Sequence, residues 1–91
     1  MTPRVILSLP MSHPDRLAPF VERCLAAKIE ILAICGTGAS AVEDDVIDLL
    51  VGDGTGPDRD LLTSVHEDGV PGALELFAEL RPETPHSVHR I

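Results

Sequence analysis

Residues 29–43 read Ile-Glu-Ile-Leu-Ala-Ile-Cys-Gly-Thr-Gly-Ala-Ser-Ala-Val-Glu. An almost continuous apolar run, residues 29–35, leads through two closely spaced glycines into a segment with helical spacing of apolar residues. A continuous apolar run is typical of a strand that is buried on both faces, as in a parallel sheet. The sequence therefore predicts a strand, a tight glycine turn and a helix, which is the repeating unit of an α/β fold.

Two further strand candidates flank this unit in the sequence. Residues 4–9 are mostly apolar and are stopped by Pro10, and residues 61–65 form a shorter run that suits a sheet edge. Strands that alternate with helices form parallel sheets with right-handed crossovers. Because the most apolar strand, residues 4–9, is expected in the centre, we predict a three-stranded parallel sheet in a β-α-β-α-β-α chain. Its predicted strand order is 2-1-3, the half-flavodoxin arrangement of a Rossmann-like domain, rather than 3-2-1.

Three helices are predicted from apolar residues that recur every three or four positions. The first begins near Arg16, the second runs from Ser40 to Gly52, and the third covers residues 71–80. Their expected inward residues are Leu17, Phe20, Val21, Cys24 and Leu25 in the first, Val42, Val46, Leu49 and Leu50 in the second, and Ala73, Leu74, Phe77 and Leu80 in the third.

Polar residues at the expected helix starts predict N-terminal caps. Ser12 with Asp15, and Ser40 with Glu43, lie at the spacing of a capping box. Asp68 is expected to cap the third helix.

The length of 91 residues corresponds to one small domain. Hydrophobic residues make up 44% of the chain and charged residues 24%, which is typical of a globular protein. We assign residues 1–82 to a single α/β domain and residues 83–91 to a loose C-terminal tail. No apolar run approaches the roughly 20 residues that cross a bilayer, so no membrane role is expected.

The charge balance points to a protein partner rather than to nucleic acid. Fifteen acidic and seven basic residues give a formal net charge of −8, and aromatic residues are only 2%. Such a chain repels phosphate backbones and has few rings to stack on bases. The acids of the second helix could face a basic protein partner; they are Glu43, Asp44, Asp45 and Asp48. The two open edges of the sheet also favour a homodimer.

Cysteine usage favours a reducing compartment. The two cysteines, Cys24 and Cys35, fall on a helix face and a buried strand end, which is not the disulfide framework of a small secreted domain. We therefore expect reduced thiols and a cytoplasmic location. Arginine is preferred over lysine, with Lys28 as the single lysine, and this composition suggests a GC-rich bacterial genome.

The predicted topology brings three polar segments to one edge of the sheet. In open α/β sheets, ligands bind beyond the carboxyl ends of the strands, near the point where the strand order reverses. The candidate ligand-binding residues are Ser12, His13, Cys35, Gly36, Thr37, Gly38, Ser40, His66, Glu67 and Asp68.

The glycine turn has two interpretations. Residues 36–41 match G-x-G-x-x-A between a strand and a helix, where a phosphate could approach the backbone and the free amides of the helix. However, the next strand ends at Glu67, much farther from Gly36 than the roughly 20 residues expected for a ribose-binding acid. An anion or nucleotide pocket and a plain strand-to-helix turn both remain open. No Gly-Lys-Ser or Gly-Lys-Thr is present, so a Walker A motif is excluded and no cofactor is assigned.

The remaining reactive residues have simpler alternatives. Cys35 precedes a helix start, a setting that can activate a thiol, but a buried structural thiol is the favoured interpretation. His66 could act as a general base assisted by Glu67, Asp68 or Cys35. No paired metal-ligand spacing occurs, so no metal is assigned. The aspartates of residues 53–60 do not match an EF-hand and indicate a solvated turn; they are Asp53, Asp58 and Asp60.

Three stretches carry a resemblance to a known family. They are Val-Gly-Asp-Gly at 51–54, Leu-Leu-Thr-Ser-Val-His-Glu-Asp at 61–68 and Ala-Leu-Glu-Leu-Phe at 73–77. Together they resemble a family of small bacterial α/β domains of unknown function, and the resemblance covers residues 29–80. It implies no activity, substrate or catalytic residue, but it draws attention to residues 63–68.

Three classes of function follow from these observations. The first is a non-enzymatic interaction or regulatory module, dimeric and acidic. The second is a small-ligand domain that uses Gly36, Thr37 and Gly38 to bind an anion or nucleotide. The third is a small enzyme that uses His66. Fold alone does not choose among them.

Overall fold

The computed structural model describes residues 2–51 and 61–91 and places four parallel strands in one sheet. Their order across the sheet is β3-β2-β1-β4. The strands are β1 (Arg4–Ser8), β2 (Ile31–Cys35), β3 (Leu62–His66) and β4 (His86–His89).

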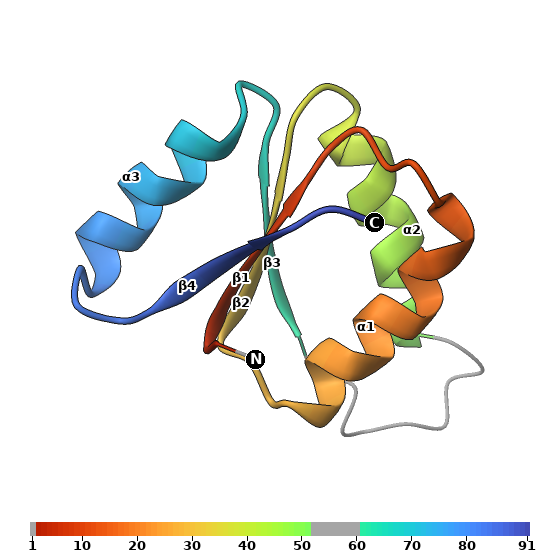
Figure 1. Ribbon diagram of the computed structural model, residues 1–91, viewed down its shortest axis with the longest axis horizontal. Coiled ribbons are helices and arrows are strands. Elements are labelled where there is room, and N and C mark those ends of the chain that lie inside the picture. The colour runs from red at the N-terminus through yellow and green to blue at the C-terminus, as the bar shows by residue number, and fades with distance from the viewer. Residues whose placement is uncertain (1, 52–60) are drawn as a thin grey trace.

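Helices lie on both faces of this sheet. The helices are η1 (Pro14–Arg16), a 3-10 turn, followed by α1 (Leu17–Ala26), α2 (Ala39–Val51) and α3 (Val70–Leu80). Helices α1 and α2 cover one face and α3 covers the other (Figure 1). The α/β class and the parallel sheet predicted from the sequence are therefore confirmed. Within the described residues, no helix has the length and apolar character needed to cross a membrane.

The predicted strand number and order are wrong. The sheet has four strands in the order 3-2-1-4, not three in the order 2-1-3. Residues 86–89, expected in a loose tail, pair with β1 in parallel, from Arg4 opposite His86 to Leu7 opposite His89. Because β4 takes the place beside β1, β3 lies outside β2 at the other edge.

Two apolar clusters form the core, one on each face. The larger lies between the sheet and helices α1 and α2, and includes Val5, Leu7, Phe20, Leu32, Ile34 and Val46. The smaller lies under α3 and includes Ile6, Ala33, Cys35, Ala73 and Phe77. The inward stripe predicted for α1 is confirmed, whereas Leu74 and Leu80 of α3 are 39% and 50% exposed instead of buried. A single helix on that face leaves part of the sheet's apolar side chains near solvent.

The predicted caps are wrong in detail. The N-caps of η1 and α1 are His13 and Arg16, and neither makes a side-chain capping hydrogen bond, so Ser12 does not cap. Ser40 lies inside α2, which begins one residue earlier. The N-cap of α3 is Gly69 rather than Asp68.

Glu43 has a different partner from the one that a capping box requires. It accepts a hydrogen bond from Thr63 Oγ1 of β3 at 3.0 Å, so it ties α2 to the sheet edge. The expected helix end at Gly52 and the aspartates of residues 53–60 lie outside the described residues.

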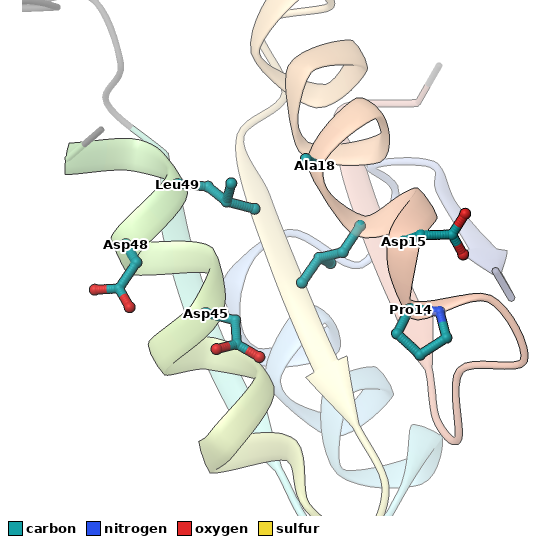
Figure 2. Close-up of a pocket in the computed structure, with 7 residues that line it drawn as sticks. Pro14, Asp15, Ala18, Asp45, Asp48 and Leu49 are labelled. Atoms are coloured by element: carbon teal, nitrogen blue, oxygen red, sulfur yellow. The ribbon is translucent and has the colours of Figure 1, made fainter. Parts of the chain in front are cut away.

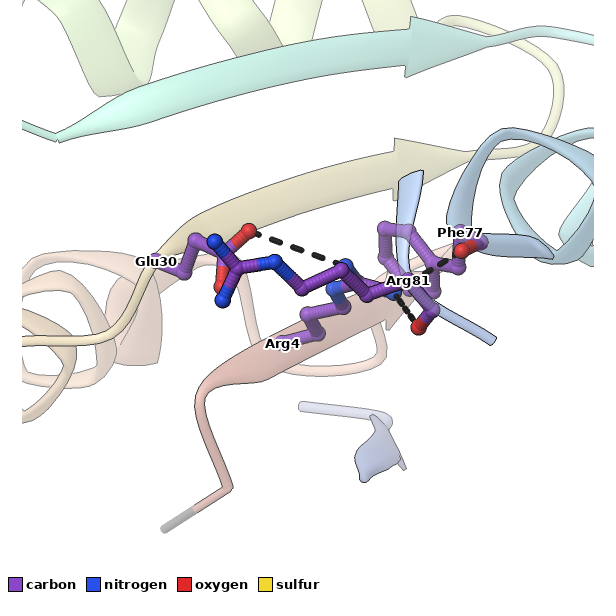
Figure 3. Close-up of polar contacts among 4 residues, drawn as sticks. All are labelled: Arg4, Glu30, Phe77 and Arg81. Atoms are coloured by element: carbon purple, nitrogen blue, oxygen red, sulfur yellow. Dashed lines mark hydrogen bonds and ion pairs between the residues drawn. The ribbon is translucent and has the colours of Figure 1, made fainter. Parts of the chain in front are cut away.

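A buried arginine joins the start of β1 to the end of α3. The side chain of Arg4 is fully buried, and its Nη1 donates to the carbonyl oxygens of Phe77 at 2.9 Å and Arg81 at 2.8 Å (Figure 3). Its guanidinium also lies 5.3 Å from the centre of the Phe77 ring, and Nη2 lies 3.7 Å from Glu30. The same two carbonyls accept the backbone amides of Arg81 and Thr84, both at 3.1 Å, so Arg4 adds a second, charged donor at the end of α3.

Candidate functional site

Backbone hydrogen bonds hold the carboxyl ends of three strands together. The Gly36 amide donates to the carbonyl of His66 at 2.9 Å, and the Leu9 amide donates to the carbonyl of Cys35 at 2.8 Å. Cys35 and His66 are direct register partners on β2 and β3. The structure thus brings together the Cys35–Gly38 and His66–Asp68 segments, as the sequence predicted.

The glycine turn is tightly packed at its first glycine and open at its second. Gly36 has φ +122°, and a Cβ there would lie 3.0 Å from the Cβ of Leu9. Gly38 has φ +86°, with no atom within 4 Å of the position of a Cβ. The first glycine is therefore explained by close packing against the chain that follows β1. The exposed Thr37 and Ser40 border the second glycine.

Ser12 and His13 join a different part of the sheet edge. Their amides both donate to the carbonyl oxygen of Ile91, at 2.6 and 3.0 Å, beyond the end of β4. In the observed order, the strand sequence reverses between β1 and β4, which is where open α/β sheets bind ligands. The backbone hydrogen bonds from Ser12 and His13 to Ile91 bridge the space between the ends of β1 and β4. The glycine turn does not lie there but at the end of β2. The anion or nucleotide site stays a prediction.

Both cysteines are buried free thiols. Burial, with a smaller contribution from the negative charge of Asp68, raises the pKa of the Cys35 thiol to about 11. Burial likewise raises the pKa of Cys24 to about 11, although the positive charge of Arg23 opposes the rise. Since the thiolate is the nucleophilic form, neither thiol has the character of an activated cysteine.

His66 lies among three polar or small neighbours on the α3 face of the sheet. Its Nε2 forms a hydrogen bond of 3.0 Å with Ser64 Oγ. A Cβ added at Gly72 would meet His66 Nδ1 at 3.2 Å and the two carboxylate oxygens of Asp68 at 2.8 and 3.2 Å. His66 Nδ1 and Asp68 therefore both border the first turn of α3, and the side chains of Glu67 and Asp68 are both exposed. Ser64 was not among the sequence candidates.

No metal centre is formed in the part of the chain that the structure describes. Residues 2–51 and 61–91 contain no group of three or more His, Cys, Asp or Glu side chains arranged to hold a metal ion.

A groove between α1 and α2 is the second candidate site. Of its lining, the sequence indicated only the acids of α2 as a binding surface. It has a volume of about 410 Å³ and is lined by Pro14, Asp15, Leu17, Ala18, Asp45, Asp48 and Leu49. In Figure 2, Leu49 points from α2 toward α1, and Asp45 lies one helical turn earlier. Apolar side chains thus contribute to the groove together with three exposed carboxylates, Asp15, Asp45 and Asp48. The sequence indicated the acids of α2 but not that η1 would lie opposite them.

Comparison of the chain with protein-family models, with curated proteins and with solved structures found no match. The resemblance to a family of small bacterial domains stays a prediction, and the function has to be argued from the two sites themselves.

Proposed function

We propose that this domain is an interaction module that binds a positively charged, partly apolar segment of a partner protein in the groove between α1 and α2. The observation that carries the proposal is the combination of apolar lining and carboxylates in one groove. The partner segment would place an aliphatic side chain between Leu17 and Leu49 and arginine or lysine side chains beside Asp15, Asp45 and Asp48.

The apolar lining would supply most of the binding free energy. Each Å² of apolar surface removed from water contributes about 25 cal/mol. Leu17 is largely buried between the helices, while Leu49 is half-buried and Ala18 and Pro14 are exposed, so apolar surface is available for contact. An aliphatic anchor flanked by cations fits this surface better than a purely polar ligand.

The carboxylates would supply selectivity and speed more than affinity. An exposed ion pair contributes only about 0.2–1 kcal/mol. However, a negative patch on a chain of net charge −8 steers a basic partner toward the groove and repels acidic ones. The association should therefore weaken as the salt concentration rises.

The test uses a short peptide that alternates arginine with leucine, titrated into isotopically labelled protein and followed by NMR. We expect shift changes to cluster at the amides of residues 15–18 and 45–49 and to diminish in high salt. The same peptide with glutamate in place of arginine should leave these amides unchanged. Shift changes spread evenly over all acidic surfaces would overturn the proposal.

A matched pair of double variants separates the groove from overall charge. Asp45→Asn with Asp48→Asn removes two charges from the groove, and Glu75→Gln with Glu79→Gln removes two exposed charges from α3. We expect the first pair to weaken peptide binding several-fold and the second to leave it nearly unchanged. Equal weakening by both pairs would indicate attraction to the whole molecule instead of a groove.

We also propose that two copies of the chain associate through an edge of the sheet. The outer strands are β3 and β4. Strand β4 carries no charged residue or proline, and its Val88 is 50% exposed. Such an edge offers unpaired backbone groups to a second strand.

A further inference from the structure

The segment that follows β4 is bonded to one wall of the α1–α2 groove. The amides of Ser12 and His13 donate to the carbonyl oxygen of Ile91, at 2.6 and 3.0 Å. The next two residues, Pro14 and Asp15, line the groove. In Figure 1 the chain passes from β4 toward the side of the sheet that carries α1 and α2. The hydrogen bonds to Ile91 therefore fix the chain directly before η1.

A second contact joins β4 to the same wall farther along α1. The ring of His89 packs against the ring of Phe20, with ring centres 5.5 Å apart. Phe20 is three residues after Leu17, which lines the groove, and both side chains are buried. Residues three apart on a helix are neighbours on its surface. The wall that η1 and α1 form is thus held by β4 and the residues after it at two points.

Strand β4 itself buries little apolar surface. Its single apolar side chain, Val88, is 50% exposed, and the strand lies at an edge of the sheet, paired with β1. Segments with few buried apolar groups open locally at a lower free energy than the core does. A modest change in the interactions of β4 is therefore enough to loosen it while the rest of the domain stays folded.

A chain of hydrogen bonds determines which ring nitrogen of His89 carries the proton. The Thr2 hydroxyl donates to the carbonyl of Arg4 at 2.7 Å, and its oxygen also lies 2.7 Å from Ser87 Oγ. Because a hydroxyl has a single proton, the Ser87 hydroxyl is the donor to Thr2. The Ser87 oxygen then accepts from His89 Nε2, which lies 2.8 Å away. Neutral His89 therefore carries its proton on Nε2, and a second proton has to bind Nδ1.

The surroundings of His89 oppose this second proton. The Arg23 guanidinium lies 5.7 Å from the centre of the Phe20 ring, the same ring that His89 packs against. The next residue, Arg90, is exposed and also positive, and the register partner on β1 is the apolar Leu7. Burial, the charge of Arg23 and the amino terminus of the chain all lower the pKa of His89. Protonation is therefore easier when the end of β4 is released than when it is docked.

We propose that residues 86–91 form a pH-sensitive clamp on the α1–α2 groove: when His89 takes up a proton, the end of β4 loosens and η1 loses its hydrogen bonds to Ile91. The inference rests on the proposed function, because the binding that it regulates is that of the positively charged segment in this groove. Once the clamp is released, Asp15 has no fixed position opposite the acids of α2, so partner binding weakens.

The direction of the pH effect follows from linkage. The released segment takes up its proton near the ordinary pKa of histidine, 6.5, whereas the docked segment does so only at a lower pH. Docking is therefore fully favoured above pH 6.5 and becomes less favourable as the pH falls toward the lowered pKa of His89. The groove should be complete at neutral pH and loosened in mild acid.

Amide exchange of the full chain, measured by NMR without any partner, tests the clamp first. We expect the exchange protection of the Ser12 and His13 amides to fall several-fold between pH 7.5 and pH 5, together with the titration of the His89 ring protons. The Gly36 amide donates to the carbonyl of His66, between β2 and β3, and should keep its protection. This comparison separates local release from unfolding of the whole domain.

Three variants separate His89 from other titrating groups. His89→Gln retains an N–H donor for Ser87 but cannot become charged, so the pH dependence of the two amides should largely disappear. The matched control His86→Gln changes an exposed histidine of the same strand and should keep it. Thr2→Val removes the hydroxyl bonded to Ser87 and should lower the protection of both amides at every pH. Circular dichroism of each variant verifies that it is folded.

The peptide that alternates arginine with leucine, blocked at both ends, then tests the link to the groove. Arginine keeps its charge over this pH range, so the peptide itself does not titrate. Its affinity should fall between pH 7.5 and pH 5 several-fold more in the native protein and in His86→Gln than in His89→Gln.

Two results would overturn the proposal: an equal loss of peptide affinity in His89→Gln and the native protein, or unchanged protection of the Ser12 and His13 amides while His89 titrates. A different result would count against the proposed function alone. If the peptide does not bind at pH 7.5 but both amides still follow the titration of His89, the clamp exists and the groove has another role.

Discussion

The backbone at Gly36 passes so close to Leu9 that a Cβ at position 36 would lie 3.0 Å from the Leu9 Cβ. Gly36 also has a positive φ of +122°, and its amide donates to the carbonyl of His66. This one residue therefore connects the ends of β1, β2 and β3 at the edge where the glycine turn lies.

Replacement of the two turn glycines should have unequal effects on stability. Gly36→Ala adds a steric contact to the backbone strain, whereas Gly38→Ala adds strain only, because the space around it is open. Strain of this kind costs about 1–3 kcal/mol. We expect Gly36→Ala to lower the free energy of unfolding, measured in urea, by at least about 1 kcal/mol more than Gly38→Ala. Equal losses would show that the contact with Leu9 relaxes without cost.

Loss of the buried guanidinium should loosen the end of α3. Arg4→Met keeps an apolar stem but removes the charged donor that the carbonyls of Phe77 and Arg81 have in addition to their backbone amide donors. A hydrogen bond from a charged group contributes about 1.5–3 kcal/mol, so we expect a loss of about 2 kcal/mol in unfolding free energy. Amides near Phe77 and Arg81 should exchange faster with solvent. The exposed Arg90→Met changes the charge equally and should leave both measurements almost unaltered.

The stability of the domain should decrease in mild acid because of His89. Burial, and then the charge of Arg23, lower the pKa of His89 below its ordinary value of 6.5. The unfolded chain therefore takes up a proton at a higher pH than the folded chain does. This contribution to stability is fully present above pH 6.5 and is lost as the pH falls toward the lowered pKa of the folded state.

The variant His89→Gln isolates this effect. Urea unfolding between pH 7.5 and pH 5 should show a smaller decrease in stability for His89→Gln than for the native protein. His86→Gln changes a histidine of the same strand that is exposed and serves as the control. If both variants keep the full pH dependence, His89 is not its source.

The proposed dimer predicts a concentration-dependent mass in light scattering at physiological salt. A lysine on an edge strand opposes pairing with a second strand, so Val88→Lys should give a monomer. Ile47→Lys introduces the same charge on α2, where Ile47 is 42% exposed, and should leave the dimer intact. A monomeric native protein, or dissociation by Ile47→Lys alone, would contradict pairing through β4.

Local sequence patterns predicted the elements of the core but not their assembly. The apolar runs of β1 and β2 and the stripe of α1 are visible in the sequence because burial requires apolar residues at fixed spacing. Strand β4 has a single apolar residue, Val88, and is held to β1 by backbone pairing, which any sequence can make. The strand order depended on that pairing, so it could not be predicted from composition or periodicity.

For a similar reason, the sequence predicted the placement of only some of the candidate site residues. Cys35 and His66 lie at the same edge because parallel strands of similar length end together, as predicted. Their direct pairing follows from β2 lying next to β3, which the predicted order 2-1-3 did not include. Ser12 and His13 do not lie with Cys35 and His66, because β4 and Ile91 occupy the position beside β1. Their amides are bonded to Ile91 instead. Ser64 is not among the site residues predicted from the sequence, although the repeated Ser-Val-His at 64–66 and 87–89 is visible there. Comparison of its two copies would have drawn attention to it.

The pairing of β1 with β4 has a consequence for how the protein is made. Strand β1 leaves the ribosome well before β4, its partner in the register from Arg4 to Leu7, because β4 is synthesised only after α3. During that interval a nascent chain exposes one side of an apolar strand, which is open to pairing with other chains. Translation speed over the later part of the sequence, and chaperones that shield β1 meanwhile, should therefore govern how much of this protein reaches its native state.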